Sequence, residues 1–242
     1  MRGTILTMGG GGFSMPEVHG REFSPLDAEL NRLSGADPTG KGRPKVCFIG
    51  TASGDADSYH DKFLAAYAGR SEAKVLSLFN KAPEGHELPI NDLEQLLDQD
   101  IVYVGGGSTA NLLAVWRLHG LPALLEKAAA GGTILAGISA GANCWYEASS
   151  TDSFGPTAPL PDGLGFLPGS FCPHYLGEED RRETYVRFVG SGALPSGYAA
   201  DDGVALLWRD GELVEAISER SDGVAYAVGP DGETPLEVRV LD

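Results

Sequence analysis

A serine flanked by small residues is the first feature of the sequence that could do chemistry. Ser139 lies in the stretch GISAGAN at 137–143, directly after the apolar run 133–136. The pentapeptide GISAG matches the GxSxG pattern, in which a strand turns sharply into a helix and exposes the serine hydroxyl. Because a predicted strand precedes this turn and residues 142–147 can begin a helix, we predict that Ser139 is a nucleophile.

A serine hydroxyl is a weak nucleophile unless a base takes its proton, and histidine is the usual base near neutral pH. The sequence has histidines at 19, 60, 86, 119 and 174. Only His174 follows Ser139, and it lies in the apolar segment FCPHY at 171–175, which would hold an imidazole stiffly. We therefore predict that His174 is the base.

A carboxylate must fix the imidazole tautomer and stabilise its protonated form. Asp201 and Asp202 interrupt the small and apolar run AADDGVAL at 199–206, where charges are rarely found without a partner. Asp152 and Glu147 are competing candidates, and either could instead cap a helix or face solvent. An α/β-hydrolase places its acid before its histidine, so this chain order argues against a lipase or esterase of that fold.

The negative charge that develops on a substrate carbonyl oxygen needs backbone N–H donors. The N–H of Ala140 is one candidate donor. The other is expected from the loop GGGS at 105–108, which could equally be a tight turn or an anion cradle at the start of the next helix. Both interpretations put this loop at the same sheet edge as Ser139.

Two further motifs bear on ligand binding. The run GGGG at 9–12 lacks the Gly-Lys-Ser/Thr ending of a phosphate loop, so we expect it to line the same cleft as Ser139. No HExxH pattern occurs, and the tripeptide CPH at 172–174 is too little for a metal site. We expect neither a metal nor a cofactor.

Short apolar runs alternate with helical patterns over the first two thirds of the chain. The runs are continuous, as in strands that are covered on both faces. Predicted strands lie at 4–8, 46–51, 74–79, 101–104 and 133–138, and predicted helices at 25–34, 57–69, 91–97, 108–119 and 121–130. This order predicts an α/β fold with a mostly parallel sheet between helices.

After residue 195 the sequence predicts four strands, at 197–208, 212–217, 224–228 and 236–241. Asp-Gly pairs at 210–211, 222–223 and 231–232 separate them and can supply the positive φ angles of tight hairpin turns. We therefore predict antiparallel C-terminal strands. Because no linker, repeat or low-complexity stretch occurs, we expect a single domain over 1–242.

The charge balance excludes some partners. The chain has 34 acidic and 18 basic residues, a net charge of -16, which repels phosphate backbones and anionic lipid, so we expect neither nucleic acid nor a membrane as partner. The cysteines at 47, 144 and 172 lack CxxC spacing and suit reduced, packed thiols. Without a signal peptide or a membrane-spanning stretch, a cytoplasmic protein is expected.

Four stretches together resemble a known family. YVGGGSTANLL at 103–113, GISAGAN at 137–143, PHY at 173–175 and DDGVAL at 201–206 are similar, in this order, to motifs of the aspartyl dipeptidase (dipeptidase E) and cyanophycinase family of serine peptidases. The similarity spans nearly the whole chain, including an opening like MGGGGFS. It implies a three-layer fold similar to class I glutamine amidotransferases, with serine in place of their cysteine, and is compatible with a homodimer.

The resemblance also implies roles for residues. The nucleophile, the base and the two oxyanion donors carried over by motif are Ser139, His174, Gly107 and Ala140. The family's third member is often a glutamate followed by glycine or asparagine, which falls on Asp202; because aspartate is one methylene shorter, Asp201 and Asp152 stay as alternatives. We expect substrate contacts from Gly106, Asn143 and Arg181.

The run after the histidine bears on substrate choice. Aspartyl dipeptidases of this family read the substrate's N-terminal aspartate with an arginine in a Gly-Glu-Thr-Arg-like run, and here the run is GEEDR at 177–181. Direct register puts Asp180 at the arginine's place, and a slip of one residue puts Arg181 there. Arg181, Arg182 or Arg187 could instead hold a peptide's terminal carboxylate, or pair with the glutamates at 178, 179 and 183.

We predict a serine exopeptidase that hydrolyses short peptides through an acyl-enzyme, with Asp-X dipeptides as the leading substrates. A carboxypeptidase-like or other small-peptide hydrolase on the same fold is the first alternative. The others are a catalytically inactive binding domain and an amidotransferase-like glutaminase, for which Cys144 lies one helical turn late.

Overall fold

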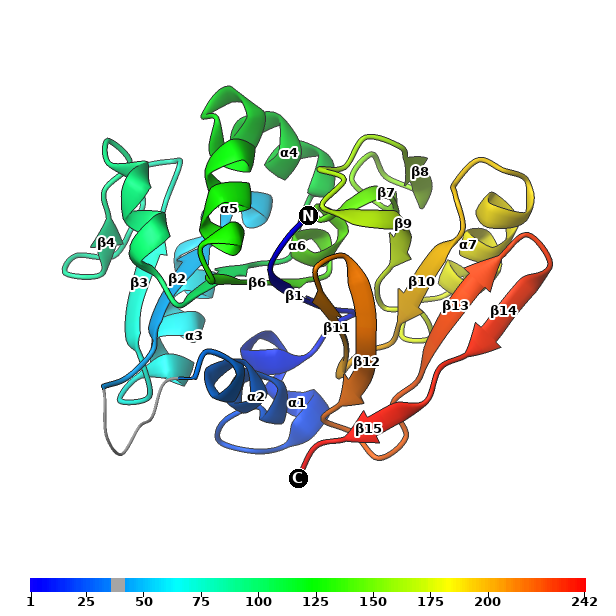
Figure 1. Cartoon of the computed structure of the whole chain (residues 1–242), viewed down its shortest axis with the longest axis horizontal. Coiled ribbons are helices and arrows are strands. Elements are labelled where there is room, and N and C mark those ends of the chain that lie inside the picture. The colour runs from blue at the N-terminus through cyan, green and yellow to red at the C-terminus, as the bar shows by residue number, and fades with distance from the viewer. Residues whose placement is uncertain (36–41) are drawn as a thin grey trace.

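A computed structural model describes residues 1–35 and 42–242 of the chain. Within these residues the main sheet has nine strands: β1 Thr4–Met8, β2 Lys45–Ile49, β3 Glu72–Leu76, β4 Glu87–Leu88, β5 Ile101–Val104, β6 Ile134–Ile138, β11 Val204–Arg209, β12 Glu212–Ser218 and β15 Val238–Val240. Their order is β15-β12-β11-β1-β6-β5-β2-β3-β4. The sheet runs across the middle of the molecule (Figure 1).

The part of the main sheet from β1 to β4 is entirely parallel. β6 lies between β1 and β5, and all five of its residues are buried. A strand covered on both faces has no reason to alternate polar and apolar side chains, which is why continuous apolar runs located β1, β2, β5 and β6 correctly. β3 begins two residues earlier than predicted and ends before the polar turn that follows it.

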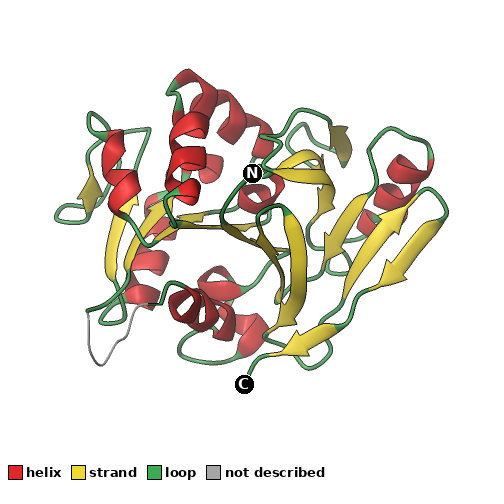
Figure 2. Cartoon of the chain, in the orientation of Figure 1, coloured by secondary structure: helices red, strands yellow, loops and turns green. Residues whose placement is uncertain are grey.

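Helices cover both faces of this sheet, as predicted. α2 Pro25–Leu33 and α3 Asp57–Tyr67 lie on one face, and α4 Thr109–Leu118 and α5 Leu121–Ala130 lie on the other (Figures 1 and 2). Ser24 caps α2 by accepting hydrogen bonds from two backbone N–H groups, and Ser108 caps α4 through one. The helix predicted at 91–97 is instead the 3-10 helix η3 Leu93–Asp98.

The structure has a second sheet that the sequence did not predict. Within the described residues it has six strands: β7 Tyr146–Thr151, β8 Ala158–Leu160, β9 Leu167–Cys172, β10 Gly197–Ala200, β13 Ala225–Gly229 and β14 Gly232–Pro235. Their order is β14-β13-β10-β9-β7-β8. α7 Arg181–Gly190 packs on β13 and β14 beside this sheet (Figure 1).

The C-terminal strands are therefore shared between two sheets, and the prediction of one continuous strand at 197–208 is wrong. That run ends as β10 in the second sheet, passes through Asp201-Asp202-Gly203, and resumes as β11 in the main sheet. The Asp-Gly pairs at 210–211 and 231–232 do join hairpin strands. The pair at 222–223 instead connects strands of different sheets.

The remaining short elements surround the sheet edge where the predicted site residues gather. They are η1 Gly12–Ser14, α1 Pro16–His19, η2 Thr51–Ser53 and α6 Ala140–Asn143. The helix expected to continue through residue 147 ends at Asn143, and Tyr146 already begins β7. Nothing in residues 1–35 and 42–242 forms a helix long and apolar enough to cross a membrane.

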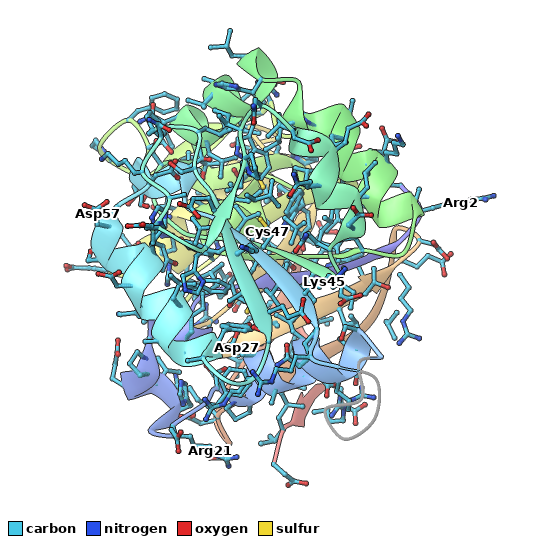
Figure 3. All side chains as sticks on the ribbon, turned by 90° about the vertical axis from the view of Figure 1, so that its left-hand side faces the viewer. Arg2, Arg21, Asp27, Lys45, Cys47 and Asp57 are labelled. Atoms are coloured by element: carbon cyan, nitrogen blue, oxygen red, sulfur yellow. The ribbon has the colours of Figure 1, made fainter. Side chains whose placement is uncertain are left out.

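Exposed arginines lie at the outer edge of the molecule, and the thiols lie inside. Figure 3 shows Arg2 and Arg21 projecting from the outline of the molecule. All three cysteines are buried and free. Burial raises the pKa of the Cys47 and Cys172 thiols to about 12, so both stay protonated at neutral pH.

Candidate active site

Ser139 occupies a sharp turn between β6 and α6. Its backbone has φ 53° and ψ -115°, which is rare for a residue with a side chain. A Cβ on Gly137 would lie 2.0 Å from the carbonyl oxygen of Gly141, so the turn closes only because residue 137 has no side chain. The Ser139 hydroxyl does not cap α6, and its backbone N–H donates to the Met8 carbonyl at 3.0 Å. The hydroxyl is thus left available for chemistry.

His174 and Asp202 form a close pair. Nδ1 of His174 lies 2.6 Å from Oδ1 of Asp202, and each side chain is 17% exposed. His174 follows the end of β9 and has a left-handed φ of 51°, so its backbone turns directly after the strand. Asp202 lies in the link between β10 and β11. A carboxylate in this position orients the ring and stabilises its protonated form.

The two alternative acids lie elsewhere. Oδ1 of Asp201 accepts the N–H of Leu176 at 3.1 Å, and its Oδ2 lies 3.9 Å from Nη1 of Arg220. Asp201 therefore fastens the loop that follows His174. Asp152 is exposed directly after β7 and lines the cavity beside Ser139. Only Asp202 of the three touches the imidazole.

Asp202 lies between two glycines. A Cβ on Gly10 would come within 2.0 Å of Oδ1 of Asp202 and 2.9 Å of Cε1 of His174. A Cβ on Gly177 would come within 2.5 Å of the other carboxylate oxygen. Gly10 also pairs with Asp202 as an isolated β-bridge, and its carbonyl accepts the N–H of Gly203 at 3.1 Å. This close backbone approach brings the Asp202 carboxylate within reach of the ring, although its side chain is one methylene shorter than that of a glutamate.

The free nitrogen of the imidazole is Nε2, because Nδ1 is held by Asp202. Nε2 is the nitrogen that would take a proton from Ser139. Among the described residues Ser139 and His174 are not hydrogen-bonded to each other. In many enzymes the contact between nucleophile and base is long until substrate binds.

Two backbone N–H groups border the serine as possible oxyanion donors. Ala140 begins α6, where the first N–H groups of a helix have no internal acceptor. Gly107 has φ 136° and lies in the loop between β5 and α4, where its neighbour Gly106 donates its N–H to the Tyr59 hydroxyl at 3.2 Å. A Cβ on Gly106 would lie 3.9 Å from Oγ of Ser139, so this loop borders the serine.

A cavity of about 170 Å³ opens beside Ser139. It is lined by Gly107, Thr109, Ser139, Ala140, Asn143, Thr151, Asp152, Pro173, Glu178 and Arg181. The lining thus joins the serine and both candidate oxyanion residues to two of the three residues predicted to contact substrate. Arg181 pairs with Glu178, and Arg182 pairs with Glu233 outside the cavity. Asp180 ends up at the start of α7 with an exposed side chain.

Comparisons with known proteins agree with this geometry. The model of peptidase family S51 matches residues 5–216. The chain belongs to peptidase family S51. A Bacillus subtilis (strain 168) protein named uncharacterized peptidase YgaJ is 42% identical to this S51 chain over 243 residues, covering 98% of each. Peptidase E of Streptomyces coelicolor (strain ATCC BAA-471 / A3(2) / M145) is 31% identical over 205 residues, 84% of this chain and 78% of that protein.

The fold of the S51 chain is also similar to a solved one. A crystal structure of a peptidase from an acI-B1 Actinobacterium superposes with a TM-score of 0.67 over 98% of this chain and 95% of that chain, at 16% identity. The family and its relatives make this chain a serine-type peptidase of the dipeptidase E and cyanophycinase group, as the motifs indicated. The predicted α/β three-layer fold is confirmed.

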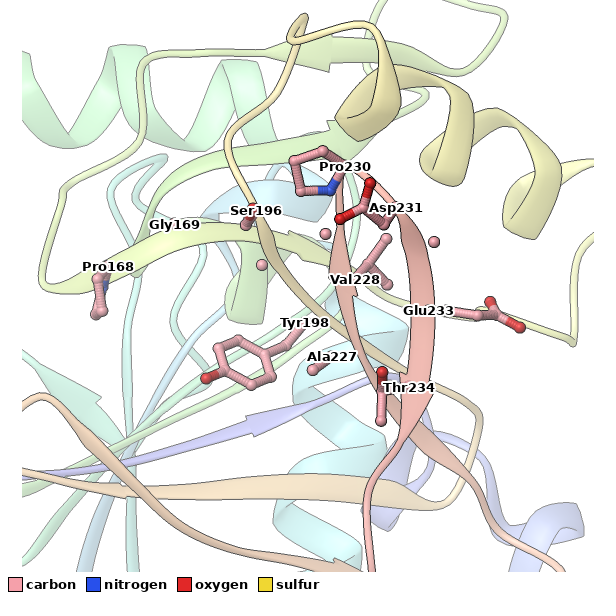
Figure 4. A pocket seen from close by; sticks show the side chains of 13 residues that line it. Pro168, Gly169, Ser196, Tyr198, Ala227, Val228, Pro230, Asp231, Glu233 and Thr234 are labelled. Atoms are coloured by element: carbon pink, nitrogen blue, oxygen red, sulfur yellow. The ribbon is translucent and has the colours of Figure 1, made fainter.

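A larger cavity of the S51 peptidase, of about 550 Å³, lies on the second sheet (Figure 4). Its lining comes from Pro168 and Gly169, from the start of β10, and from the β13–β14 hairpin. None of these lining residues is a site residue predicted from the sequence, and the lining has neither the elbow serine nor the candidate oxyanion donors that border the small cavity.

Burial raises the pKa of the Cys144 thiol well above its ordinary value, which disfavours the glutaminase alternative.

Some residues around the S51 site were missed in the sequence. Tyr59 on α3 accepts the N–H of Gly106, Thr109 accepts a hydrogen bond from the Asn143 amide at 3.3 Å, and Thr151 lines the cavity from β7. Tyr59 lies on α3, and the sequence did not predict which side of this helix faces the site. Thr151 lies on β7, a strand that the sequence did not predict. From the sequence alone, Glu178 is expected only as a partner for an arginine.

A methyl group on Gly10 is expected to disturb the His174–Asp202 pair of the S51 peptidase. Gly10→Ala would push the Asp202 carboxylate away from the ring, and misplacing a catalytic group by about 1 Å costs roughly 10²-fold in rate. We expect that loss in kcat/KM on a short peptide. Gly190→Ala is the control, because it is exposed at the end of α7 with nothing closer than 3.7 Å to the added carbon. Equal activity of both variants would contradict this.

A buried acidic cluster lies behind the glycine run at 9–12 of the S51 peptidase. Oδ1 of Asp27 accepts the Tyr67 hydroxyl at 3.0 Å, and Oδ2 is buried without a partner among the described residues. Glu219 accepts the N–H of Gly12 at 3.0 Å and the hydroxyl of Ser24 at 2.5 Å. Burial raises the pKa of the Asp27 carboxyl from 3.8 to about 7, and nearby Glu219 adds to this.

Asp27 is therefore expected to make the S51 peptidase less stable as pH rises from about 4 to 7. Over that range the folded protein keeps a proton that the unfolded chain has lost, so the free energy of unfolding falls, by on the order of 4 kcal/mol for this group. Asp27→Asn should gain stability relative to wild type with rising pH in urea titrations. Asp61→Asn, exposed on α3, is the control; parallel pH curves for wild type and Asp27→Asn would refute the assignment.

Proposed function

We propose that this S51 peptidase is an exopeptidase of short peptides, with Ser139 as nucleophile, His174 as base and Asp202 as the third member of the triad. The observation that carries the proposal is the 2.6 Å contact between His174 and Asp202 beside an elbow serine. Burial of the pair to 17% exposure strengthens the contact, since exposed ion pairs contribute little. The chain would act as one catalytic unit, because the three residues come from both sheets.

The chemistry follows from these positions. Nε2 of His174 takes the Ser139 proton as Oγ forms a bond to the substrate carbonyl carbon, and the carbonyl oxygen gains the negative charge. The N–H groups of Gly107 and Ala140 are proposed to bind that oxygen. Collapse breaks the C–N bond, the amine leaves with the proton from Nε2, and a water then hydrolyses the acyl-enzyme by the same proton transfers in turn.

The cavity beside Ser139 supports small substrates. Its volume of about 170 Å³ is well below the roughly 300–1,000 Å³ of pockets that enclose drug-sized ligands. A space of this size suits the side chain of a single residue. This favours cleavage next to a chain end over cleavage within a long peptide.

Arg181 favours the binding of an acidic substrate side chain in that cavity. Its side chain is 3% exposed, and a guanidinium recognises a carboxylate through a pair of parallel hydrogen bonds. An Asp-X dipeptide would place its aspartate side chain against Arg181. The carboxypeptidase-like alternative uses the same arginine for a terminal carboxylate, so peptide order decides between them.

A labelling experiment followed by a peptide screen tests the proposal. A fluorophosphonate probe should label wild type at Ser139 and leave Ser139→Ala unlabelled; absence of labelling of the wild type would favour an inactive binding domain. Hydrolysis rates are then compared for Asp-Leu, Leu-Asp and a longer Asp-initiated peptide. Faster cleavage of Asp-Leu is expected, and preference for Leu-Asp would support the carboxypeptidase-like alternative.

A further inference from the structure

A buried carboxylate lies near the triad without belonging to it. Glu219 follows β12 directly and is only 6% exposed. Its Oε1 accepts the N–H of Gly12 at 3.0 Å, and its Oε2 accepts the hydroxyl of Ser24 at 2.5 Å. Burying a carboxylate is costly unless hydrogen bonds replace the lost water, so these two hydrogen bonds are what keep the Glu219 side chain inside the protein.

The main chain of Glu219 reaches the residue after the triad acid. Its N–H donates to the carbonyl of Gly203 at 2.9 Å, and the N–H of Gly203 donates to the carbonyl of Gly10 at 3.1 Å. Gly203 directly follows Asp202. Glu219 is therefore connected to the surroundings of Asp202 twice, through its backbone to Gly203 and through its side chain to the glycine run at 9–12.

The glycine run decides where the Asp202 carboxylate can lie. Gly10 is packed against both side chains of the His174–Asp202 pair, since a Cβ there would come within 2.0 Å of Oδ1 of Asp202 and 2.9 Å of Cε1 of His174. Gly11 and Gly12 have φ angles of 100° and 57°, which glycine adopts more readily than other residues. Because glycine restricts the backbone least, the run has little stiffness of its own and needs outside contacts to fix it.

The hydrogen bond from Gly12 to Glu219 supplies such a contact. A Cβ on Gly11 would lie 2.4 Å from Oε1 of Glu219, so the carboxylate lies directly against the run. At its other oxygen Glu219 is bonded to Ser24, the residue that caps α2. The run is thereby tied to a helix, and a shift at Gly12 would be passed to Gly10, two residues earlier.

The backbone of Asp202 has a separate support. Nη1 of Arg220 donates to the Asp202 carbonyl at 3.3 Å, and the rest of that guanidinium pairs with Asp222 at 2.9 Å. This contact fixes the main chain of the link between β10 and β11. The direction of the Asp202 side chain therefore depends on the two glycines that flank its carboxylate, Gly10 and Gly177.

We propose that Glu219 is a positioning residue of this S51 peptidase, which holds the glycine run, and with it the Asp202 carboxylate, where the imidazole of His174 needs it. The proposal rests on the triad proposed above. Glu219 is not among the residues that line the cavity beside Ser139, so it acts through Asp202 rather than on the substrate. A change at Glu219 should therefore alter kcat and leave KM nearly unchanged.

Two conservative variants separate the reach of Glu219 from its charge. Glu219→Asp keeps the charge and shortens the side chain by one methylene, so it either draws Gly12 out of place or loses its N–H. Glu219→Gln keeps the length, and its amide oxygen still accepts the Gly12 N–H. Its amide N–H groups, however, meet a Ser24 oxygen that already accepts two hydrogen bonds. The first variant should disturb the triad, and the second should lose stability without disturbing it.

Steady-state kinetics on a dipeptide that the wild type cleaves measure the effect. Glu219→Asp is expected to lower kcat roughly 10²-fold, because misplacing a catalytic group by about 1 Å costs that much in rate. Glu219→Gln should stay within about threefold of the wild-type kcat. Glu212→Asp, exposed at the start of the same strand, is the matched control and should leave kcat unchanged. A wild-type kcat in Glu219→Asp, or an equal loss in Glu219→Gln, would overturn the inference, whatever the melting temperatures.

A spectroscopic measurement locates the effect at the contact between His174 and Asp202. The proton shared between Nδ1 and the carboxylate should give a far-downfield ¹H NMR resonance that disappears in Asp202→Asn. That resonance is expected to move upfield in Glu219→Asp and to stay in place in Glu219→Gln and Glu212→Asp. An unmoved resonance in Glu219→Asp would overturn the inference even if kcat fell, because the loss would then arise elsewhere.

The two measurements separate this inference from the function it rests on. The resonance requires no turnover, so it can also be recorded in Ser139→Ala. If the wild type does not react with a fluorophosphonate, the peptidase mechanism fails, while a resonance that moves in Glu219→Asp still supports Glu219 as the residue that positions Asp202. If wild type and Glu219→Asp are equally active, the triad stands and this inference fails.

Discussion

Ser139→Ala is expected to lower kcat/KM on the order of 10⁴-fold or more, with little change in thermal unfolding. Removing the nucleophile of a triad leaves only the contributions of binding and of the oxyanion donors. The hydroxyl makes no capping hydrogen bond to α6, so the fold loses no contact there when it is removed. Steady-state kinetics and a melting curve on the same preparation measure both effects.

Ser139→Gly is the companion variant. It should be equally inactive, yet it should not lose the stability that glycine usually costs, because a residue with φ 53° and ψ -115° is strained unless it lacks a Cβ. Measurable turnover by either variant would remove Ser139 from the mechanism. A lower melting temperature for the glycine variant alone would contradict the strain at this turn.

Asp202→Asn is expected to have the second largest effect, a fall in kcat on the order of 10⁴-fold. An amide of the same shape can hold the ring in the wrong tautomer and cannot stabilise the imidazolium. The 2.6 Å contact with Nδ1 is the one that would be altered. The KM should change far less than kcat, since Asp202 does not line the cavity beside Ser139.

Two neighbouring aspartates are the controls for Asp202. Asp201→Asn keeps an oxygen to accept the Leu176 N–H, and Asp152 lies exposed at the end of β7, so we expect kcat to change by less than about tenfold in each. A severe loss in Asp152→Asn together with an active Asp202→Asn would transfer the role of third member to Asp152.

The parallel core of the fold could be predicted from the sequence because it obeys local rules. β6 is five buried residues in a row, and its last two begin the pentapeptide 137–141, in which Gly137 and Gly141 lie against backbone. A run of this kind predicts a buried strand and a tight turn whatever residues surround it in the fold. The alternation of strands and helices along the chain, together with the family resemblance, then predicted the three layers.

The second sheet could not be predicted because its strands have no such local pattern. β7 reads YEASST, with serine and threonine buried beside other strands, and β9 contains Pro168 and Gly169. Their burial depends on distant partners. The break within 197–208 is hidden for the same reason, since Ala200 and Val204 look like neighbours in one strand and lie in different sheets.

The sequence predicted which residues form the candidate site but not which of their atoms are in contact. Ser139 and His174 follow from motif and chain order, whereas choosing Asp202 over Asp201 depends on which carboxylate faces the ring. Two adjacent residues in a link point in different directions, and sequence does not say which. Glu178 likewise becomes informative only once it shares a cavity with Arg181.

The three-residue link 201–203 has a mechanical consequence. It connects β10 of the second sheet to β11 of the main sheet. His174 follows β9 of the second sheet, and Ser139 follows β6 of the main sheet. A small rotation of one sheet against the other would change the distance between His174 and Ser139 while every strand stayed intact. We therefore expect a change in how the two sheets pack to lower the peptidase activity before it alters a measurement of secondary-structure content.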